Sequence, residues 1–418
     1  MKYISTRDNS KEYNFEQVFI KGLADDGGLF IPKKIKIYTQ EELSALSNLS
    51  YQDLAKEILF PFIGSFMSER ELSDIVDKSY SVFRKDNAVD LIKVGNTKIL
   101  ELFHGPTLAF KDIAMQLLGN FYEHYLKKNC KNLNVIVATS GDTGAAAIDA
   151  IKGKNNINIF VLHPHNKISI VQRKLMSTVK EKNVFNIAIE GNFDDCQNLV
   201  KSMFSDKEFS NSINMSGVNS INWARIIAQS VYYFYSYFLV KDDRPVNFSV
   251  PTGNFGDVYA GYLSKKMGLP INKLIVATNK NDILNRAISN GKYEVETVFE
   301  TNSPSMDIQI ASNFERLIYD LNDCDDVRTK NIMRGIKEEG KYILSKEILK
   351  KINKNFLSAS LNEDEVLKVI QEVYKKHKVI LDPHSAIAFG ALKNKINLDG
   401  NNVVLATAHP CKFPDTIN

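Results

Sequence analysis

Lys111 stands in the sequence HGPTLAFKDIA, residues 104–114, with apolar side chains before and after it. A lysine ammonium that is buried among such neighbours loses its proton more easily, and the neutral amine can attack a carbonyl to form a Schiff base. The alternative is a surface lysine whose alkyl chain lies on apolar neighbours while its ammonium stays in water. In a chain with 53 lysines and arginines, this segment by itself favours the surface lysine.

The sequence VPTGNFGDVYAG, residues 250–261, predicts a strand, a glycine-rich turn and the start of a helix. Gly253 and Gly256 let the backbone approach a ligand, and the free amides of a helix N-terminus attract a phosphate. The spacing is neither GxGxxG nor GxxxxGK[ST]. A turn that needs glycine only for its geometry is an equally good interpretation of this loop alone.

A second loop of the same kind lies in ATSGDTGAAA, residues 138–147. Its hydroxyl groups, on Thr139, Ser140 and Thr143, stand beside a predicted helix N-terminus. Amides and hydroxyls together suit a carboxylate. Simple capping of the helix by Ser140, Asp142 or Thr143 is the better interpretation of this loop alone.

The sequence NSINWARI, residues 219–226, brings amide, hydroxyl and guanidinium groups together before an apolar helix. Arg225 can hold a phosphate or a carboxylate through two parallel hydrogen bonds, with Asn219 and Ser220 nearby. Alone, the segment favours a helix cap followed by a surface arginine.

Near the C-terminus, LATAHPCKF places Thr407 and His409 at the end of a predicted strand. His409 precedes a proline and by itself indicates a turn. Neither it nor the HPH sequence at 163–165 has a ligand partner at a metal-binding spacing, so no metal site is expected. The sequence also contains no GxSxG motif.

Taken together, these segments point to one chemistry. Pyridoxal 5′-phosphate requires a lysine for its aldehyde, a phosphate site and a partner for its ring nitrogen, and its amino-acid substrate requires a carboxylate site. No single loop indicates this cofactor, but the combination does.

The elements that must position these loops alternate between strands and helices from about residue 92 onward. Strands are predicted in INIFVLHP (157–164), VFNIAIEG (184–191), KLIVATN (273–279) and NNVVLATAHP (401–410), and strand–loop–helix units in residues 133–153 and 245–270. This order predicts an α/β fold with mainly parallel sheets, whose ligands bind at the carboxyl ends of strands. The first ninety residues predict helices at 39–47 and 50–63.

The bulk composition is that of a water-soluble globular protein, with 44% hydrophobic and 24% charged residues. A net charge of +4 gives no reason to expect nucleic acid or an anionic membrane as partner. The apolar span at 226–240 contains polar residues and is short for a bilayer, so it predicts a buried helix. Four widely spaced cysteines and a polar N-terminus favour a reduced, cytoplasmic setting.

The chain resembles the threonine synthase family, pyridoxal-phosphate enzymes of the tryptophan-synthase-β-like fold, or fold type II. The resemblance is carried by motifs in order along almost the whole chain: YISTR, GLADDGGLFIP, ELFHGPTLAFKD, ATSGDTGAAA, NSINWARI, VPTGNFGDVYAG, PSMDIQIASNFERL, LDPHSAIAFGAL and ATAHPCKF. It implies an N-terminal family-specific domain at 1–90 and a catalytic region at 91–418. The catalytic region would comprise a smaller lobe at about 112–240 and a larger lobe from about 91–111 and 241–418, with an N-terminal helical segment preceding both.

The resemblance also implies residue roles. Lys111 would hold the cofactor and shuttle protons, Asp142 would approach its ring oxygen, and the hydroxyl of Thr407 would face its ring nitrogen. Other roles fall on two groups. The cofactor phosphate would lie on Gly253, Asn254, Phe255, Gly256 and Asp257, and the substrate would be bound by Ser140, Thr143, Asn219, Ser220 and Arg225. Cys411 stands where relatives usually carry alanine.

The implied reaction converts O-phospho-L-homoserine and water to L-threonine and phosphate, by a monomer or homodimer. A serine or threonine dehydratase of the same fold is the nearest alternative, and it would have no use for a phosphate site at Arg225. A non-catalytic descendant that binds phosphorylated ligands is a second alternative, against which the retained Lys111 argues.

Overall fold

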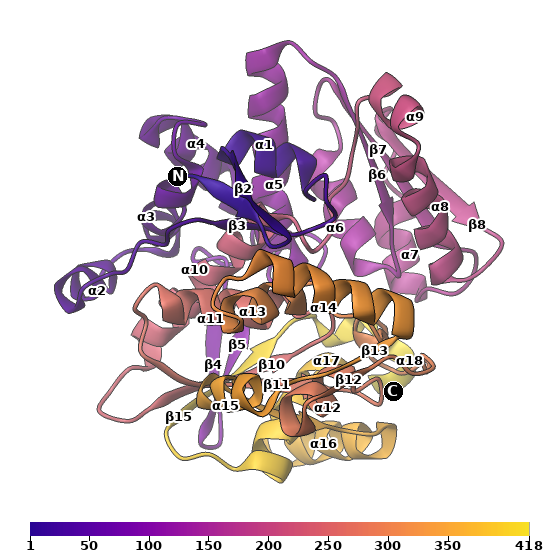
Figure 1. The fold of residues 1–418 in the computed structure, drawn as a ribbon. Coiled ribbons are helices and arrows are strands. Elements are labelled where there is room, and N and C mark those ends of the chain that lie inside the picture. The colour runs from indigo at the N-terminus through magenta and orange to yellow at the C-terminus, as the bar shows by residue number, and fades with distance from the viewer. Residues whose placement is uncertain (418) are drawn as a thin grey trace.

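The computed structural model describes residues 1–417 as two α/β lobes with an N-terminal segment packed on them (Figure 1). The larger lobe is built on a six-stranded sheet in which every strand but β4 runs parallel to its neighbours. Its strands, in spatial order, are β14 (Phe356–Ser360), β11 (Ile271–Thr278), β10 (Val246–Pro251), β15 (Asn401–Ala406), β5 (Thr97–Glu101) and β4 (Asp90–Val94).

The smaller lobe contains a four-stranded, fully parallel sheet. Its strands, in spatial order, are β8 (Val184–Ile189), β7 (Ile157–Pro164), β6 (Leu133–Ala138) and β9 (Met215–Ser216). The helices of this lobe are α6 (Asp142–Ile151), α7 (Ile170–Ser177), α8 (Phe193–Ser205) and α9 (Lys207–Ser212). The predicted α/β class with mainly parallel sheets is confirmed.

Two long helices, α5 (Lys111–Asn129) and α10 (Trp223–Val240), pack against each other and are buried along most of their length. Helix α10 also packs on α3 (Tyr51–Ile63) and on α11 (Gly256–Lys266). The apolar span at 226–240 is therefore a buried helix, as predicted. Among residues 1–417, no helix has the length and apolar character that a membrane crossing requires.

The N-terminal segment combines helices with a small antiparallel sheet of β2 (Asp8–Tyr13), β1 (Tyr3–Ser5) and β3 (Phe30–Pro32). The helices predicted at 39–47 and 50–63 are α2 (Gln40–Leu46) and α3, and the side chains of Thr39 and Ser50 cap them. Helices α1 (Phe15–Lys21) and α4 (Glu69–Tyr80) and the small sheet were not predicted.

The larger lobe has further helices around its sheet and a short antiparallel pair of strands (Figure 1). The helices are α12 (Ile283–Asn290), α13 (Phe314–Leu321), α14 (Asp326–Glu339), α15 (Lys346–Asn355), α16 (Glu363–His377), α17 (Pro383–Gly390) and α18 (Pro414–Ile417). The pair of strands is β12 (Lys292–Glu294) and β13 (Lys341–Ile343). One continuous hydrophobic core joins the N-terminal segment to both lobes, so the site between the lobes rests on a single packed body.

Candidate active site

Lys111 is the first residue of α5, and the loop before it is joined to the end of β15. The Phe110 amide donates to the Thr407 carbonyl at 2.8 Å, and the His409 amide donates to the Leu108 carbonyl at 3.0 Å. Leu108 adopts the left-handed conformation, with φ of 61°, which is unfavourable for a leucine and occurs mainly where function requires it. These bonds fix Thr407 beside the residue that precedes Lys111.

The side chain of Lys111 is only 11% exposed, so the surface-lysine interpretation is wrong. Its Nζ lies 3.5 Å from Oδ2 of Asp142. Burial lowers the pKa of Lys111, the charge of Asp142 opposes this, and the positive charges of Lys412 and Arg225 reinforce it. The net direction is downward, which favours the neutral, nucleophilic amine.

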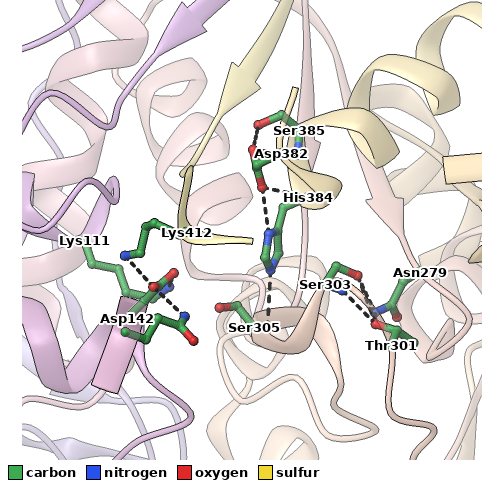
Figure 2. Close-up of polar contacts among 11 residues, drawn as sticks. Lys111, Asp142, Asn279, Thr301, Ser303, Ser305, Asp382, His384, Ser385 and Lys412 are labelled. Carbon is green, nitrogen blue, oxygen red and sulfur yellow. Dashed lines mark hydrogen bonds and ion pairs between the residues drawn. The ribbon is translucent and has the colours of Figure 1, made fainter. Parts of the chain in front are cut away.

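Asp142, the first residue of α6, is buried between two lysines (Figure 2). Its Oδ1 accepts from Lys412 Nζ at 2.6 Å and from the Gln172 side-chain amide at 2.8 Å. Burial opposes ionisation, but the charges of Lys412 and Lys111 outweigh it and hold the pKa of Asp142 well below its usual range. Asp142 is therefore a fixed negative charge beside the reactive amine.

The capping interpretation of residues 138–147 is wrong for Ser140, Asp142 and Thr143. Gly141 occupies the N-cap of α6 with φ of 135°, and no side chain caps it there. Instead the Thr139 hydroxyl accepts from the amides of Gly141 and Gly144, both at 2.9 Å. The hydroxyls of Ser140 and Thr143 are thus left available to a ligand at this helix start, as their predicted role requires.

Residues 253–257 connect β10 to α11. A Cβ added to Gly253 would lie 2.7 Å from the Ser305 carbonyl oxygen, so only glycine fits. Asn254 ties the loop to its neighbours: its Oδ1 accepts from the Ser312 amide at 2.6 Å, and its side-chain amide donates to the Ser220 hydroxyl. Phe255 is held in the left-handed conformation, with φ of 62°, immediately before α11 begins.

The side chain of Asp257 is hydrogen-bonded to two tyrosines of α10. Its Oδ1 accepts from the hydroxyls of Tyr232 at 2.5 Å and Tyr233 at 2.9 Å. Burial raises the pKa of Asp257 to about 6, although these two hydrogen bonds partly offset it. A role of Asp257 in holding the cofactor stays a prediction, and it would fall to the backbone amide rather than to this carboxyl group.

Arg225 lies in the first turn of α10 and is only 4% exposed, so it is not a surface arginine. Its Nη1 donates to the Val218 carbonyl at 3.1 Å, and its Nε has no partner among the described residues. Burial lowers the pKa of Arg225 to about 10. A buried guanidinium with an unused donor is what an anion site requires.

Of the two residues predicted to assist Arg225, Ser220 is half-buried and contacts Asn254 of the glycine loop, whereas Asn219 is exposed. The helix cap itself is Asn222, whose side chain accepts from the Ala224 amide at 3.0 Å. The structure therefore places Ser220 against the glycine loop and Asn219 at the rim, and the charge of Arg225 acts on Lys111.

A polar network holds the segment that packs on Gly253 (Figure 2). The Ser305 amide donates to Nε2 of His384 at 3.4 Å, and Nδ1 of His384 is 2.8 Å from Asp382. These residues belong to the motifs PSMDIQIASNFERL and LDPHSAIAFGAL, so the two motifs meet behind the glycine loop.

Four site residues were missed: Gln172, Asn313, Arg316 and Lys412. Arg316 is fully buried and donates to the Ile221 carbonyl at 2.7 Å, and the Asn313 side chain donates to the Ser220 and Asn254 carbonyls at 3.2 and 3.1 Å. Lys412, Asn313 and Arg316 lie within motifs that carried the resemblance. For Gln172 no local pattern gave a signal.

These residues fit pyridoxal phosphate. A buried lysine amine faces a fixed carboxylate, a glycine loop opens a helix nearby, and a buried arginine has an unused donor. Two parallel α/β lobes with such a site define a pyridoxal-phosphate-dependent enzyme of fold type II. Its family is recognised by two models: "Threonine synthase N terminus" matches residues 2–80, and "Pyridoxal-phosphate dependent enzyme" matches residues 99–408. The chain belongs to the threonine synthase family.

Individual members of the family match this chain over its full length. Threonine synthase of Pseudomonas aeruginosa is 45% identical over 100% of this chain and 90% of its own, and that of Saccharomyces cerevisiae is 44% identical over 100% and 88%. The structure of pyridoxal-phosphate-bound threonine synthase from Brucella melitensis superposes with a TM-score of 0.96 at 46% identity, covering 100% of this chain and 90% of that one. The predicted family, fold and cofactor are confirmed.

Proposed function

We propose that the protein converts O-phospho-L-homoserine and water to L-threonine and phosphate, the last step of threonine biosynthesis. The observation that carries this substrate is Arg225, a buried guanidinium with an unused Nε that acts electrostatically on Lys111. A phosphate monoester carries close to two negative charges at neutral pH, and a buried site must balance them with fixed donors. An enzyme for an unphosphorylated amino acid would leave the Nε of this guanidinium without a partner.

The substrate would lie between two helix starts. Its phosphate would be bound by Arg225 and Ser220 at the start of α10, with Asn219 at the rim. Its carboxylate would be bound at the start of α6 by backbone amides and by the hydroxyls of Ser140 and Thr143. Two anion sites at a fixed separation select a substrate with two anionic groups and orient it for reaction.

Lys111 supplies the proton transfer. Bound pyridoxal phosphate would bond to the substrate's amino group and accept electron density from its α- and β-carbons. As a neutral amine, Lys111 Nζ accepts the proton from the substrate's Cα, and its lowered pKa favours that form. Overall, Cβ loses a proton and gains the hydroxyl of water, Cγ gains a proton in place of the departing phosphate, and the proton taken from Cα is returned there.

The serine or threonine dehydratase remains the rival function. The processed threonine deaminase of Solanum lycopersicum superposes with a TM-score of 0.55 at 14% identity, a likeness that extends to the fold alone.

We also propose that the protein is a cytoplasmic monomer or homodimer. Its chain would be divided into an N-terminal domain at residues 1–90, a smaller lobe at about 112–240 and a larger lobe from about 91–111 and 241–418.

The test is to incubate the cofactor-loaded protein with O-phospho-L-homoserine and to measure threonine and phosphate together. Equal amounts of the two products are expected. Release of ammonia and a keto acid from serine or threonine, without threonine formation from the phosphorylated substrate, would instead establish the dehydratase.

A further inference from the structure

Lys412 is a fully buried lysine to which the proposed function assigns no role. It ends the short 3₁₀ turn Pro410–Lys412 that follows β15, and its Nζ donates to the Thr107 carbonyl at 2.8 Å and to Asp142 Oδ1 at 2.6 Å. A buried ammonium requires partners of this kind, because burial without them is strongly unfavourable. Both partners adjoin Lys111, one in the loop before it and one facing it.

The two oxygens of Asp142 are used unequally (Figure 2). Oδ1 accepts short hydrogen bonds from Lys412 and Gln172, at 2.6 and 2.8 Å, whereas Oδ2 has Lys111 Nζ at 3.5 Å. The carboxylate is therefore neutralised mainly by Lys412, and Lys111 is held only weakly. The single negative charge of Asp142 thus lies between two lysines, and its short contact is with Lys412 rather than with the reactive Lys111.

We propose that Lys412 is a positioning residue that occupies Asp142 as a fixed counterion and thereby keeps Lys111 a neutral amine when it is not bonded to the cofactor. This inference rests on the proposed role of Lys111 as the cofactor lysine.

The charged groups around Lys111 come from four elements. They are Asp142 on α6, Lys412 after β15, Arg225 on α10 and Asp257 on α11. The positive charges of Lys412 and Arg225 act with burial to lower the pKa of Lys111, against Asp142. Without Lys412, Asp142 would hold a proton on Lys111 instead, because an opposite charge at this distance favours the charged form.

Lys412 itself faces a further acid, Asp112 on α5. Both Asp112 oxygens accept from Thr107, one from the backbone amide and one from the hydroxyl, at 2.8 and 2.7 Å. Burial outweighs these bonds and raises the pKa of Asp112 to about 6. Asp112 is thus held by Thr107, and the short ion pair of Lys412 is the one with Asp142.

The experiment measures the acid–base behaviour of Lys111 in the cofactor-free protein. An amine-acylating reagent is applied across a pH series, and peptide mapping by mass spectrometry gives the modification rate of Lys111. Lys412→Met removes the charge and retains most of the length. We expect the apparent pKa of Lys111 to rise by at least about one unit, which lowers its modification rate below that pKa about tenfold.

A double-mutant cycle separates charge from structure. Asp142→Asn should lower the apparent pKa of Lys111 below that of the unmodified protein. The double variant Asp142→Asn with Lys412→Met should return close to the starting value. Lys412→Met should raise the pKa of Lys111 more when Asp142 is present than in the Asp142→Asn background, where only direct repulsion between the two ammonium groups is lost. Lys412→Gln takes the place of Lys412→Met in this comparison if the methionine variant does not fold.

The control is Lys154→Met, which removes another largely buried lysine, paired with Glu123 at 3.0 Å. It should leave the pKa of Lys111 unchanged. An unchanged or lowered pKa of Lys111 after loss of Lys412, or an equal rise with and without Asp142, overturns the proposal. The measurement uses no substrate, so failure of the threonine assay would refute the proposed function without altering this result.

Discussion

Substitution of Arg225 is the most direct test of the proposed substrate. Losing one charged hydrogen-bonding partner of a phosphate typically costs about 2–4 kcal/mol, or roughly thirty- to a thousand-fold in kcat/KM. Arg225→Ala should therefore reduce turnover of O-phospho-L-homoserine by this factor while the visible absorption of the lysine-bound cofactor persists. Side dehydration of unphosphorylated serine or threonine should suffer much less.

The matched control is Arg334→Ala, which removes an exposed arginine on α14 and should change neither activity. Normal turnover of the phosphorylated substrate by Arg225→Ala would contradict the phosphate site. An equal loss of both activities with the cofactor retained would do the same.

A second prediction for a single residue is that Lys111 binds the cofactor covalently. Reduction of the cofactor-loaded protein with borohydride followed by peptide mapping should find the pyridoxyl group on Lys111, and Lys111→Ala should lose turnover by several orders of magnitude, because covalent attachment and proton transfer both fail. A pyridoxyl group on a different lysine would contradict the assignment.

At the level of elements, the two glycines between β10 and α11 differ in how much space surrounds them. A Cβ on Gly253 meets the Ser305 carbonyl oxygen at 2.7 Å, whereas a Cβ on Gly256 meets the end of the Asn313 side chain at 3.2 Å. Backbone yields less readily than a side-chain amide, and overpacking costs about 1–3 kcal/mol. Gly253→Ala should weaken cofactor binding more than Gly256→Ala, measured by titrating the apoprotein with pyridoxal phosphate and following visible absorbance.

Gly335 is the control for this pair. It lies within α14, and an added Cβ there would have no heavy atom within 4 Å. Gly335→Ala should leave cofactor binding unchanged and stabilise the protein by about 0.5–1 kcal/mol, because alanine favours a helix. Valine at Gly253 and at Gly256 should weaken cofactor binding further. Unaltered binding in both valine variants would refute a phosphate-binding role for this loop.

The elements that could be predicted are those whose signals are local. Strand–loop–helix units show in the alternation of β-branched runs and small-residue helices, and α2 and α3 begin at the hydroxyl caps Thr39 and Ser50. Helix α1 also has a capping box, formed by Asn14 and Gln17, but this signal was missed.

The candidate site was harder to predict from the sequence, because its contacts join residues that are far apart along the chain. Considered alone, Lys111, Asp142 and Arg225 favoured a surface lysine, a cap and a surface arginine. Asp142 and Arg225 are buried, and only 11% of the Lys111 side chain is exposed. Burial of a charged group depends on what packs over it. Lys412 lies 270 positions from Asp142, and no periodicity within either segment connects them.

On the scale of the whole molecule, an ion pair between half-buried Arg7 and buried Glu315 helps to join the N-terminal segment to the larger lobe. The Arg7 guanidinium contacts both oxygens of Glu315, at 2.8 and 2.7 Å, and Thr6 donates to the same carboxylate at 2.6 Å. Glu315→Gln removes the charge and should lower the free energy of unfolding by about 1.5–3 kcal/mol, measured in urea.

The exposed pair between Lys33 and Glu12, at 2.6 Å, is the control in the same segment. Glu12→Gln should cost no more than about 1 kcal/mol, because water screens an exposed pair. Equal losses in the two variants would show that the Arg7–Glu315 pair does not anchor the segment.

The strand order of the large sheet also has a consequence for synthesis. Strand β15 lies between β10 and β5, yet it is made after both. A growing chain that has already exposed β5 and β10 therefore carries two unpaired apolar strand edges and waits for about 150 further residues before the central strand can close them. Such late, long-range closure slows folding and leaves the intermediate open to aggregation. The yield of active protein should thus depend on translation speed and on chaperone supply.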